Sequence, residues 1–530
     1  MKKHYILLLI IPVCFILFSL LLRKTEGPYF NSLADPSYAY LVNSLSLAQM
    51  NGSHIGHVDH PGTPLQITGA VTVKLLYTFS HEKDNIAEDV LYRPEYYITA
   101  IDYTLIFLDA IGLYITGLII FSVKNNIFIS LFFQTVPFVS MKLLEVFSQV
   151  KTETYAFYII VILIALMLKY VYDPPENINP FIFLTGILCG LILATKISFV
   201  CIALIPFIMY PGLKKKILFS VTVAGSFTIF VLPAISNVNY FINWVKNLII
   251  HNDRYGKGSD SVINPDSYLT NIAKIVNNER FFAVVYLLIL IVLIISFITK
   301  NKEEAKENGN SAEMKLLYAL LAAMTLHVLL VAKHFSNRYM FPAIILAVPG
   351  LFLVIFILYK KYLSGINART VFAILFLITF LYGAYNSRKI ISRTKTRVSE
   401  TVKLNNFLKS DYPDSEIILS SGVSNEYTGL ILAYFYSGDN VRDNYSKIIT
   451  ERFPKQTWYD IFHDDMFSLT GKFDAVESLK SGKTVLFQTM DEVYNDKFTA
   501  NLKSRFDLKD ISLTKVYSNE NGELLYRIKF

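Results

Sequence analysis

Charged residues and cysteines are both scarce in this sequence. Only 17% of the 530 residues are charged, whereas soluble domains average about 25%, so a purely soluble protein is excluded. The three cysteines, Cys14, Cys189 and Cys201, all lie inside apolar runs, which favours core packing over a disulfide framework or a metal site. The net charge of +8 does not indicate a nucleic-acid partner, because many of the Lys and Arg residues lie in short loops between apolar runs.

Apolar and aromatic residues are abundant instead. Hydrophobic residues make up 53% of the chain, with 40 Phe and 34 Tyr, and aromatic residues gather at both interfaces of a membrane. The first run ends at Leu22, and no small-x-small cleavage site follows it, so a retained helix is favoured over a cleaved signal peptide. Several runs approach the ~20 residues that span a bilayer. We therefore predict a polytopic α-helical membrane protein with about eleven transmembrane helices, at residues 1–22, 97–122, 126–143, 152–171, 181–195, 197–211, 216–235, 281–299, 315–332, 339–359 and 370–386.

The segment 63–80 decides the orientation of the chain. It has the length of a span but carries several polar residues. Basic residues in short loops favour the cytoplasmic side. Suppose that Lys2 and Lys3 lie inside. If 63–80 does not span the membrane, the basic loops at 214–216 and 360–361 lie inside as well; if it spans, both loops lie outside. We therefore expect a helix at the outer interface, a cytoplasmic N-terminus, an extracytoplasmic C-terminus and a location in the cytoplasmic (inner) membrane.

The composition changes at about residue 390, where charged residues become frequent and apolar runs shorten. EIILS (416–420) and TVLFQ (484–488) are typical of buried strands, and 512–530 of a hairpin with an Asn-Glu-Asn-Gly turn. Helical spacing recurs nearby. We predict a membrane domain over 1–389, with a catalytic outer loop at 23–96, and an extracytoplasmic α/β domain over 390–530. This second domain contains no G-x-G-x-x-G and no P-loop. The helical stretches are 401–410, 425–438 and 473–482.

Asp35 is the first candidate in the outer loop, within ADPSYAY. The ring of Pro36 favours an extended backbone at the residue before it. A carboxylate beside a membrane surface can take a proton from an acceptor hydroxyl as a general base. Asp35 can equally cap a helix that begins with Pro36, and both roles can hold together.

Three histidines and an aspartate follow in the same loop. The spacing of His54, His57, Asp59 and His60 would suit a metal, and the last three could meet on a turn. A divalent metal is therefore left open, while no cofactor is indicated with certainty. Pro61 makes this a loop, where His side chains often face water. Contact of His60 with a phosphate or pyrophosphate is favoured over metal ligation.

Further ionisable residues lie at the ends of the predicted spans, where they are candidates for function. Glu153 opens the fourth span, Lys196 interrupts a long apolar stretch, and Arg338 precedes the span 339–359 with His334 beside it. Each can simply mark a solvated helix end. Two cations at headgroup level also suit a lipid-linked phosphate leaving group, whose charge grows as the sugar bond breaks.

The order of these motifs resembles the C-type glycosyltransferase (GT-C) superfamily, which includes protein O-mannosyltransferases and the aminoarabinose transferases that modify lipid A. The resemblance covers about residues 1–390. It rests on ADPSYAY, on DHPGTPLQ, on GILCGLILATK with its G-x3-G-x5-K pattern (Gly186, Gly190, Lys196), and on RYMFP from Arg338. The chain departs from the family in two places: Pro36 replaces a second acid that many members carry, and Gly62 replaces the second proline of a Pro-Pro pair.

The resemblance implies an inverting transfer of a sugar from a polyprenyl-phosphate donor to a hydroxyl of a glycan, lipid or protein acceptor. It implies Asp35 as the catalytic base and Glu153 as the matching second acid. Lys196, Arg338 and His60 would bind the donor phosphate. The remaining loop candidates, His57, Asp59 and His334, would be further contacts. Because the sugar arrives activated, no soluble nucleotide is needed.

Other classes of protein remain open. A transporter would carry ionisable or broken helices near the bilayer midplane, often in two related halves, whereas the polar residues here lie towards the outer edge. An envelope polysaccharide polymerase or ligase, with a lipid-pyrophosphate donor, is a closer alternative. A simple anchor would need far fewer spans.

Overall fold

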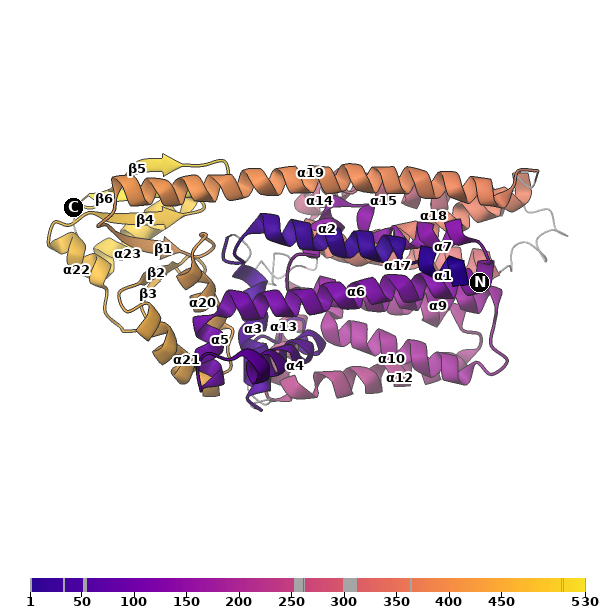
Figure 1. Cartoon of the computed structure of the whole chain (residues 1–530), viewed down its shortest axis with the longest axis horizontal. Helices are drawn as coiled ribbons and strands as arrows, with labels where there is room; N and C mark the ends of the chain where they lie inside the picture. Colours follow the sequence, from indigo (N-terminus) through magenta and orange to yellow (C-terminus); the bar gives the residue numbers. More distant parts are fainter. Residues whose placement is uncertain are drawn as a thin grey trace. The chain divides into compact units, whose positions relative to one another are not determined.

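The computed structural model describes residues 2–31, 34–50, 55–251, 261, 263–298, 312–362, 365–506, 508 and 510–529. The chain is mostly helical, and its named strands all follow residue 415 (Figure 1). It divides into two compact units. Unit 1 contains Met1–Leu20, Val58–Leu65 and Tyr103–Ile390, and unit 2 contains Leu21–His57, Gln66–Asp102 and Ile391–Phe530. The predicted domain boundary at residues 389 and 390 stays a prediction.

Eight helical stretches of the described chain are long and apolar enough to cross a membrane. They confirm a polytopic helical membrane protein. The stretches are His4–Glu26 (α1, Lys2–Leu7, and α2, Ile10–Glu26), Pro94–Lys124 (α6), Thr152–Tyr172 (α9), Leu213–Ile250 (α12, Leu213–Val231; η3, Leu232–Asn237; α13, Val238–Ile250), Arg280–Ile298 (α15), Ala312–Lys333 (α17), Asn337–Tyr362 (η5, Asn337–Met340; α18, Phe341–Tyr362) and Ala368–Asp411 (α19).

Three of the eleven predicted spans have a different form. The run 126–143 is not one helix but three short ones, because Pro137 and the capping side chain of Ser140 interrupt it. The run 181–195 is one shorter helix, and the run 197–211 is a pair of shorter helices. The pieces are α7 (Ile127–Gln134), η1 (Val136–Phe138) and α8 (Met141–Val146) for the first run, α10 (Asn179–Thr195) for the second, and η2 (Ile197–Ala203) with α11 (Leu204–Met209) for the third.

The ambiguous segment 63–80 forms one helix, α4 (Thr63–Ser80). It is not among the eight long apolar stretches of the described chain, and its place at the outer interface stays a prediction. Three more helices lie in the connecting segments: α3 (Ala34–Ala48), α5 (Ile86–Tyr92) and α14 (Pro265–Asn278).

In unit 1, two glycines bring α10 against α12 along their length (Figure 1). A Cβ atom at Gly186 would lie 2.8 Å from the Thr222 side chain, and one at Gly190 would lie 2.6 Å from Ser226 Cβ. Ser226 Oγ also donates to the Ile187 carbonyl at 3.1 Å. Small residues four positions apart allow such close backbone approach between membrane helices. The G-x3-G part of the sequence motif therefore allows α10 to pack closely against α12.

In unit 2, six strands form one mixed sheet in the order β3-β2-β1-β4-β6-β5. The central strand β1 pairs in parallel with β2 and β4, while β3, β5 and β6 pair antiparallel with their neighbours. The predicted strands at 416–420 and 484–488 and the C-terminal hairpin are confirmed. The strands are β1 (Glu416–Ser420), β2 (Thr457–Asp460), β3 (Asp465–Phe467), β4 (Val485–Thr489), β5 (Ser512–Ser518) and β6 (Leu524–Lys529).

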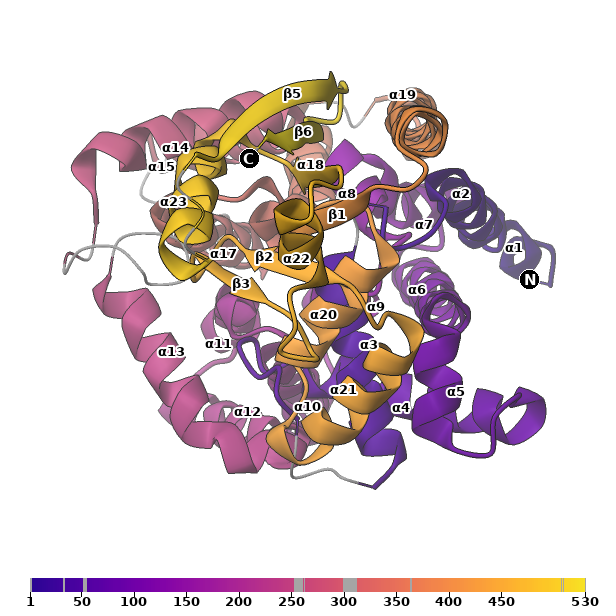
Figure 2. The ribbon, with the colours of Figure 1, turned by 90° about the vertical axis from the view of Figure 1, so that its left-hand side faces the viewer.

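Helices cover both faces of this sheet. Because side chains alternate along a strand, Phe487 of β4 faces one core and Leu486 the other. The first core contains residues of α22 (Asp474–Lys480) and α23 (Asn495–Phe506), which Figure 2 shows beside the strands. The second contains Leu404, from the end of α19. The other helices of this part are α20 (Glu426–Phe435), α21 (Asp439–Arg452) and η6 (Glu492–Tyr494). The predicted α/β domain is confirmed.

Candidate functional site

A buried ion pair joins Glu153 and Lys196 in unit 1. Lys196 Nζ lies 2.6 Å from Glu153 Oε1, and both side chains are only 4% exposed. Glu153 lies in the first turn of α9, and Lys196 follows the last residue of α10. Each charge therefore lies at the helix end whose dipole stabilises it. Thr152 Oγ1 donates to the second carboxylate oxygen at 3.0 Å.

Further positive charge gathers around this pair. Arg338 and Lys151, together with Lys196, act electrostatically on the Glu153 carboxylate. The Tyr339 ring lies 4.8 Å from Lys196 Nζ. We call Lys151, Glu153, Lys196 and Arg338 the cation cluster. Three cations around one carboxylate create a local field that favours the binding of a further anion.

His327, which was not among the predicted site residues, holds the turn that carries Arg338. Its Nε2–H donates to the Tyr339 carbonyl at 2.6 Å, and its Nδ1 lies 3.0 Å from Cys201 Sγ. The carbonyl belongs to η5, the short 3-10 helix that contains Arg338. A histidine inside the apolar run 315–332 was the available signal, because ionisable residues within membrane helices are candidates by default.

His60 comes beside the cation cluster through its backbone. Its carbonyl accepts from Ile197 N–H at 2.9 Å, and Gly62 N–H donates to the Ala194 carbonyl at 3.0 Å. These two bonds align residues 60–62 with the chain on either side of Lys196. The structure thus brings together four of the residues predicted from the sequence: His60, Glu153, Lys196 and Arg338.

The other predicted contacts of unit 1 have local partners. His334 Nε2–H donates to the Leu248 carbonyl at 3.0 Å, where it helps to close the end of α13. Asp59 interacts with the Tyr240 hydroxyl. The structure therefore shows packing contacts for both residues, and their role as substrate contacts stays a prediction.

The histidines do not form a metal site in the described part of the chain. His57 belongs to unit 2, where its ring packs edge-on against Tyr40 and Tyr436. Among the described residues, no three His, Cys, Asp or Glu side chains are placed to hold a metal ion. His54 lies outside the described residues.

Asp35 lies in unit 2 with an extended backbone, φ −91° and ψ 121°, before the helical turns that start at Pro36. This confirms the conformation expected for a residue before proline. The residue is exposed, and the structure records no hydrogen bond or ion pair from its side chain to any described residue. Its carboxylate is therefore open to a proton donor, while its position depends on the backbone that carries it.

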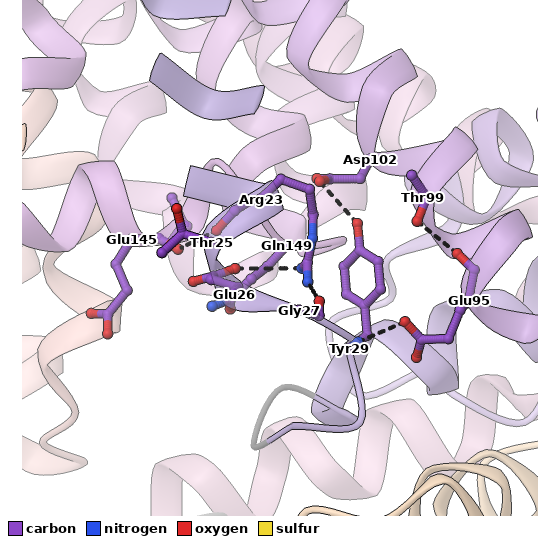
Figure 3. A network of polar contacts seen from close by, with 12 residues as sticks. Arg23, Thr25, Glu26, Gly27, Tyr29, Glu95, Thr99, Asp102, Glu145 and Gln149 are labelled. Carbon is purple, nitrogen blue, oxygen red and sulfur yellow. Dashed lines mark hydrogen bonds and ion pairs between the residues drawn. The ribbon is translucent and has the colours of Figure 1, made fainter. Parts of the chain in front are cut away.

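Glu95 fixes that backbone from a distance in sequence, as Figure 3 shows for its bond to Tyr29. Its Oε2 accepts from Tyr29 N–H at 2.7 Å. Its Oε1 accepts from Phe30 N–H at 3.3 Å and from the Tyr38 hydroxyl at 2.8 Å. Tyr29 and Phe30 precede Asp35, and Tyr38 follows it, so one carboxylate binds both sides of the Asp35 segment.

The side chain of Tyr29 is held as well. Its hydroxyl donates to Asp102 Oδ2 at 2.9 Å, and the Arg23 guanidinium lies 3.8 Å from its ring centroid (Figure 3). Burial, followed by the charge of Asp102, raises the pKa of Tyr29 well above its ordinary value. Burial and the charge of Glu95 do the same to the pKa of Tyr38. Both phenols therefore stay protonated and act as donors.

Glu95 and Asp102 were not among the predicted site residues, although the sequence contained a signal for both. Asp102 lies inside the predicted span 97–122, and Glu95 lies just before it, after Pro94. Pro at the first helical position and an acid in the first turn are typical of an ordinary helix start. An ordinary helix start does not predict the contacts of Glu95, because its partners Tyr29 and Tyr38 lie 66 and 57 positions away in the sequence.

Unit 2 also contains an open pocket of about 600 Å³. Aromatic and charged side chains share its wall, and Glu95 is one of them. The wall includes Glu82, Tyr92, Arg93, Glu95, Tyr96 and Glu426. One wall residue therefore also holds the segment that carries Asp35.

Comparison with known proteins finds similarity only at the level of structure. No protein-family model and no curated protein sequence matches this chain. The chain is similar to crystal structures of ArnT from Cupriavidus metallidurans, a lipid A aminoarabinose transferase, one bound to undecaprenyl phosphate and one in the apo state. The TM-score is 0.47 for both, with 9% and 10% sequence identity and 97% of each chain covered.

Proposed function

We propose that this protein is a membrane glycosyltransferase that moves a sugar from a polyprenyl-phosphate donor to a hydroxyl group of an acceptor, with inversion. The acceptor is a glycan, a lipid or a protein. The polyprenyl tail of the donor is apolar, as are the eight helices that can cross a membrane, so the donor and the enzyme can lie in the same lipid bilayer.

The cation cluster is the observation that carries this proposal. It joins the buried Lys196 ammonium to the Glu153 carboxylate, and Lys151 and Arg338 also act electrostatically on this carboxylate. The positive field of these cations favours a phosphate that gains negative charge during the reaction. Stabilisation of charge that develops in the transition state is often the largest contribution to catalysis.

The proposed reaction is a single displacement. The acceptor hydroxyl gives its proton to the Asp35 carboxylate while its oxygen bonds to the anomeric carbon of the donor sugar. The bond between that carbon and the phosphate oxygen breaks, and its electron pair stays on the phosphate. Lys196 and Arg338 stabilise this leaving group, and His60 contributes a further contact.

Glu153 has a supporting role in this proposal. Its carboxylate lies 2.6 Å from Lys196 Nζ, so it holds the ammonium in place. The ion pair occupies one carboxylate oxygen and the Thr152 hydroxyl donates to the other, which favours Asp35 over Glu153 as the proton acceptor.

The proposal includes an orientation in the cytoplasmic membrane, with the N-terminus inside and the C-terminal domain outside. A topology reporter fused after residue 530 should then be active only outside the cytoplasm, and one inserted at residue 308 only inside. Both positions lie outside the described residues. The reverse pattern would place 63–80 across the membrane and contradict the proposed orientation.

Mass analysis of envelope glycans, glycolipids and glycoproteins tests the function as a whole. A strain that lacks the gene should lose one sugar modification, and the wild-type gene should restore it. A gene encoding Asp35→Asn should not restore it although the protein is present in the membrane. If the deletion leaves all three classes of molecule unchanged, the proposed function is wrong.

A further inference from the structure

The three bonds that Glu95 accepts surround Asp35 in the sequence. Two come from the backbone of Tyr29 and Phe30, and the third from the Tyr38 hydroxyl. The Asp35 side chain itself has no hydrogen-bond partner among the described residues and is exposed. Its place is therefore set by the path of the chain on its two sides, and Glu95 binds both.

A carboxylate is the side chain that this arrangement requires. It has two acceptor oxygens and no donor, whereas a glutamine amide has one acceptor and one donor group. In either amide orientation, a glutamine would turn its NH₂ group towards at least one backbone N–H. A buried donor without its partner costs about 1–3 kcal/mol, enough to release one side of the segment.

The N-terminal side has a second anchor that does not involve Glu95. The Tyr29 hydroxyl donates to Asp102 and its ring lies against Arg23. Loss of the Glu95 carboxylate should therefore loosen the Asp35 segment without unfolding this part of unit 2. The contribution of Glu95 can then be measured in a folded protein.

We propose that Glu95 is a positioning residue that holds Tyr29, Phe30 and Tyr38, on the two sides of Asp35, so that the Asp35 carboxylate meets the acceptor hydroxyl in a reactive geometry. This inference rests on the proposed function. A displacement of about 1 Å in a reacting group can cost a factor of about 100 in rate. Glu95 does not touch the substrate in this account and acts through Asp35.

Steady-state kinetics of the purified full chain, with a polyprenyl-phosphate sugar as donor, gives the first readout. Glu95→Gln should lower kcat by about 10-fold to 100-fold and leave the donor KM unchanged. Glu95→Asp should restore part of the loss, and Tyr38→Phe, which removes one of the three bonds, should show a smaller loss. The matched control is Glu88→Gln, a half-buried glutamate of the neighbouring helix α5, which should behave as wild type.

A double-mutant cycle separates positioning from general stability. If Glu95 acts through Asp35, adding Glu95→Gln to Asp35→Asn should cause almost no further loss, because the base is already absent. Independent roles would give additive losses. Additive losses, or an unchanged kcat in the single variant, would overturn the inference.

Hydrogen exchange tests the geometry without any assay of activity. Glu95→Gln should speed exchange at the amides of Tyr29 and Phe30, while the amides of the central strand β1 stay protected. Unchanged exchange at Tyr29 and Phe30 would overturn the inference. Faster exchange in a protein whose wild type transfers no sugar would instead mean that Glu95 holds the segment and that the proposed function has failed.

Discussion

The cation cluster of unit 1 and the Glu95 network of unit 2 both contain a carboxylate with several partners, but the partners differ in kind. Glu153 is paired with a buried ammonium and is surrounded by further cations. Glu95 accepts from two backbone N–H groups and a phenol. In one region the carboxylate balances charge, and in the other it fixes the shape of a chain segment.

This difference predicts different consequences of mutation. Removal of one member of a buried ion pair leaves an uncompensated charge and costs about 3–5 kcal/mol. Removal of a neutral hydrogen-bond network costs about 1–3 kcal/mol for each donor left without a partner. Variants of the cation cluster should therefore affect both folding and anion binding, whereas variants of the Glu95 network should affect geometry more than stability.

The largest expected effect is that of Asp35→Asn, which tests whether the segment held by Glu95 carries the base. Asparagine keeps the size of aspartate and one side-chain oxygen but cannot accept the proton. General-base assistance is worth about 10²–10⁴ in rate, so kcat should fall by that factor while expression and donor binding persist. The measurement is sugar transfer by the purified enzyme at saturating donor.

Three further variants are compared with Asp35→Asn. Asp35→Glu keeps a carboxylate displaced by one methylene and should retain a little activity. Asp59→Asn should lose much less activity than Asp35→Asn. Near-normal transfer by Asp35→Asn, together with inactive Asp59→Asn or Glu153→Gln, would show that the base has been assigned to the wrong residue.

Lys196→Ala should have the next largest effect, because it removes a contact both to the donor phosphate and to the leaving group that this phosphate becomes. A hydrogen bond to a charged group contributes about 1.5–3 kcal/mol, so kcat/KM for the donor should fall by roughly 10-fold to 100-fold. Lys196→Arg keeps the charge and should lose less. Equal and mild effects of both would favour a lysine that only marks the helix end. Losses from Lys196→Ala and Arg338→Ala should be less than additive if both contact one phosphate.

The stability cost of Lys196→Ala has its own control. The double variant Glu153→Gln with Lys196→Met removes both charges, and replacing a buried ion pair by neutral groups of similar volume is often close to neutral in stability. The double variant should therefore recover the melting temperature that Lys196→Ala loses and still bind the donor weakly. Recovery of donor binding as well would contradict a phosphate-binding role for Lys196.

The smallest expected effect concerns the packing that carries Lys196. Gly190→Ala would place a Cβ atom 2.6 Å from Ser226 Cβ, whereas at Gly225 of the neighbouring helix a Cβ atom would meet nothing within 4 Å. Overpacking costs about 1–3 kcal/mol. Thermal unfolding in detergent should show a lower melting temperature for Gly190→Ala and no decrease for Gly225→Ala. Equal melting temperatures would mean that the glycine does not set the distance between α10 and α12.

The fold could be predicted where a local pattern is strong. Long apolar runs gave the membrane helices, and β1, β4 and the C-terminal hairpin followed from strand-length runs with a turn. The short strands β2 and β3 were missed because three or four residues carry little periodicity. The helices α21 and α23 were missed although each has a narrow apolar face, because polar residues outnumber the apolar ones in both. The run 126–143 was predicted as one helix because its composition outweighed the signal of Pro137.

The candidate site could be predicted only as a set of residues. Position at the end of an apolar run pointed to Glu153, Lys196 and Arg338. Their pairing could not be predicted, since it depends on how helices distant in sequence pack. Glu95 shows the same limit, because its partners lie 57 and more residues away. A helix-starting acid and a segment-holding acid look alike until the fold brings the partners together.

Binding of a polyprenyl phosphate is the most direct test of the central claim. Native mass spectrometry of the detergent-purified full chain with undecaprenyl phosphate should show one bound lipid for wild type and for Asp35→Asn. The variant that combines Lys196→Ala with Arg338→Ala, kept folded by Glu153→Gln, should bind at least tenfold more weakly. Equal binding by this variant and wild type, or no binding by any of the three proteins, would contradict the account.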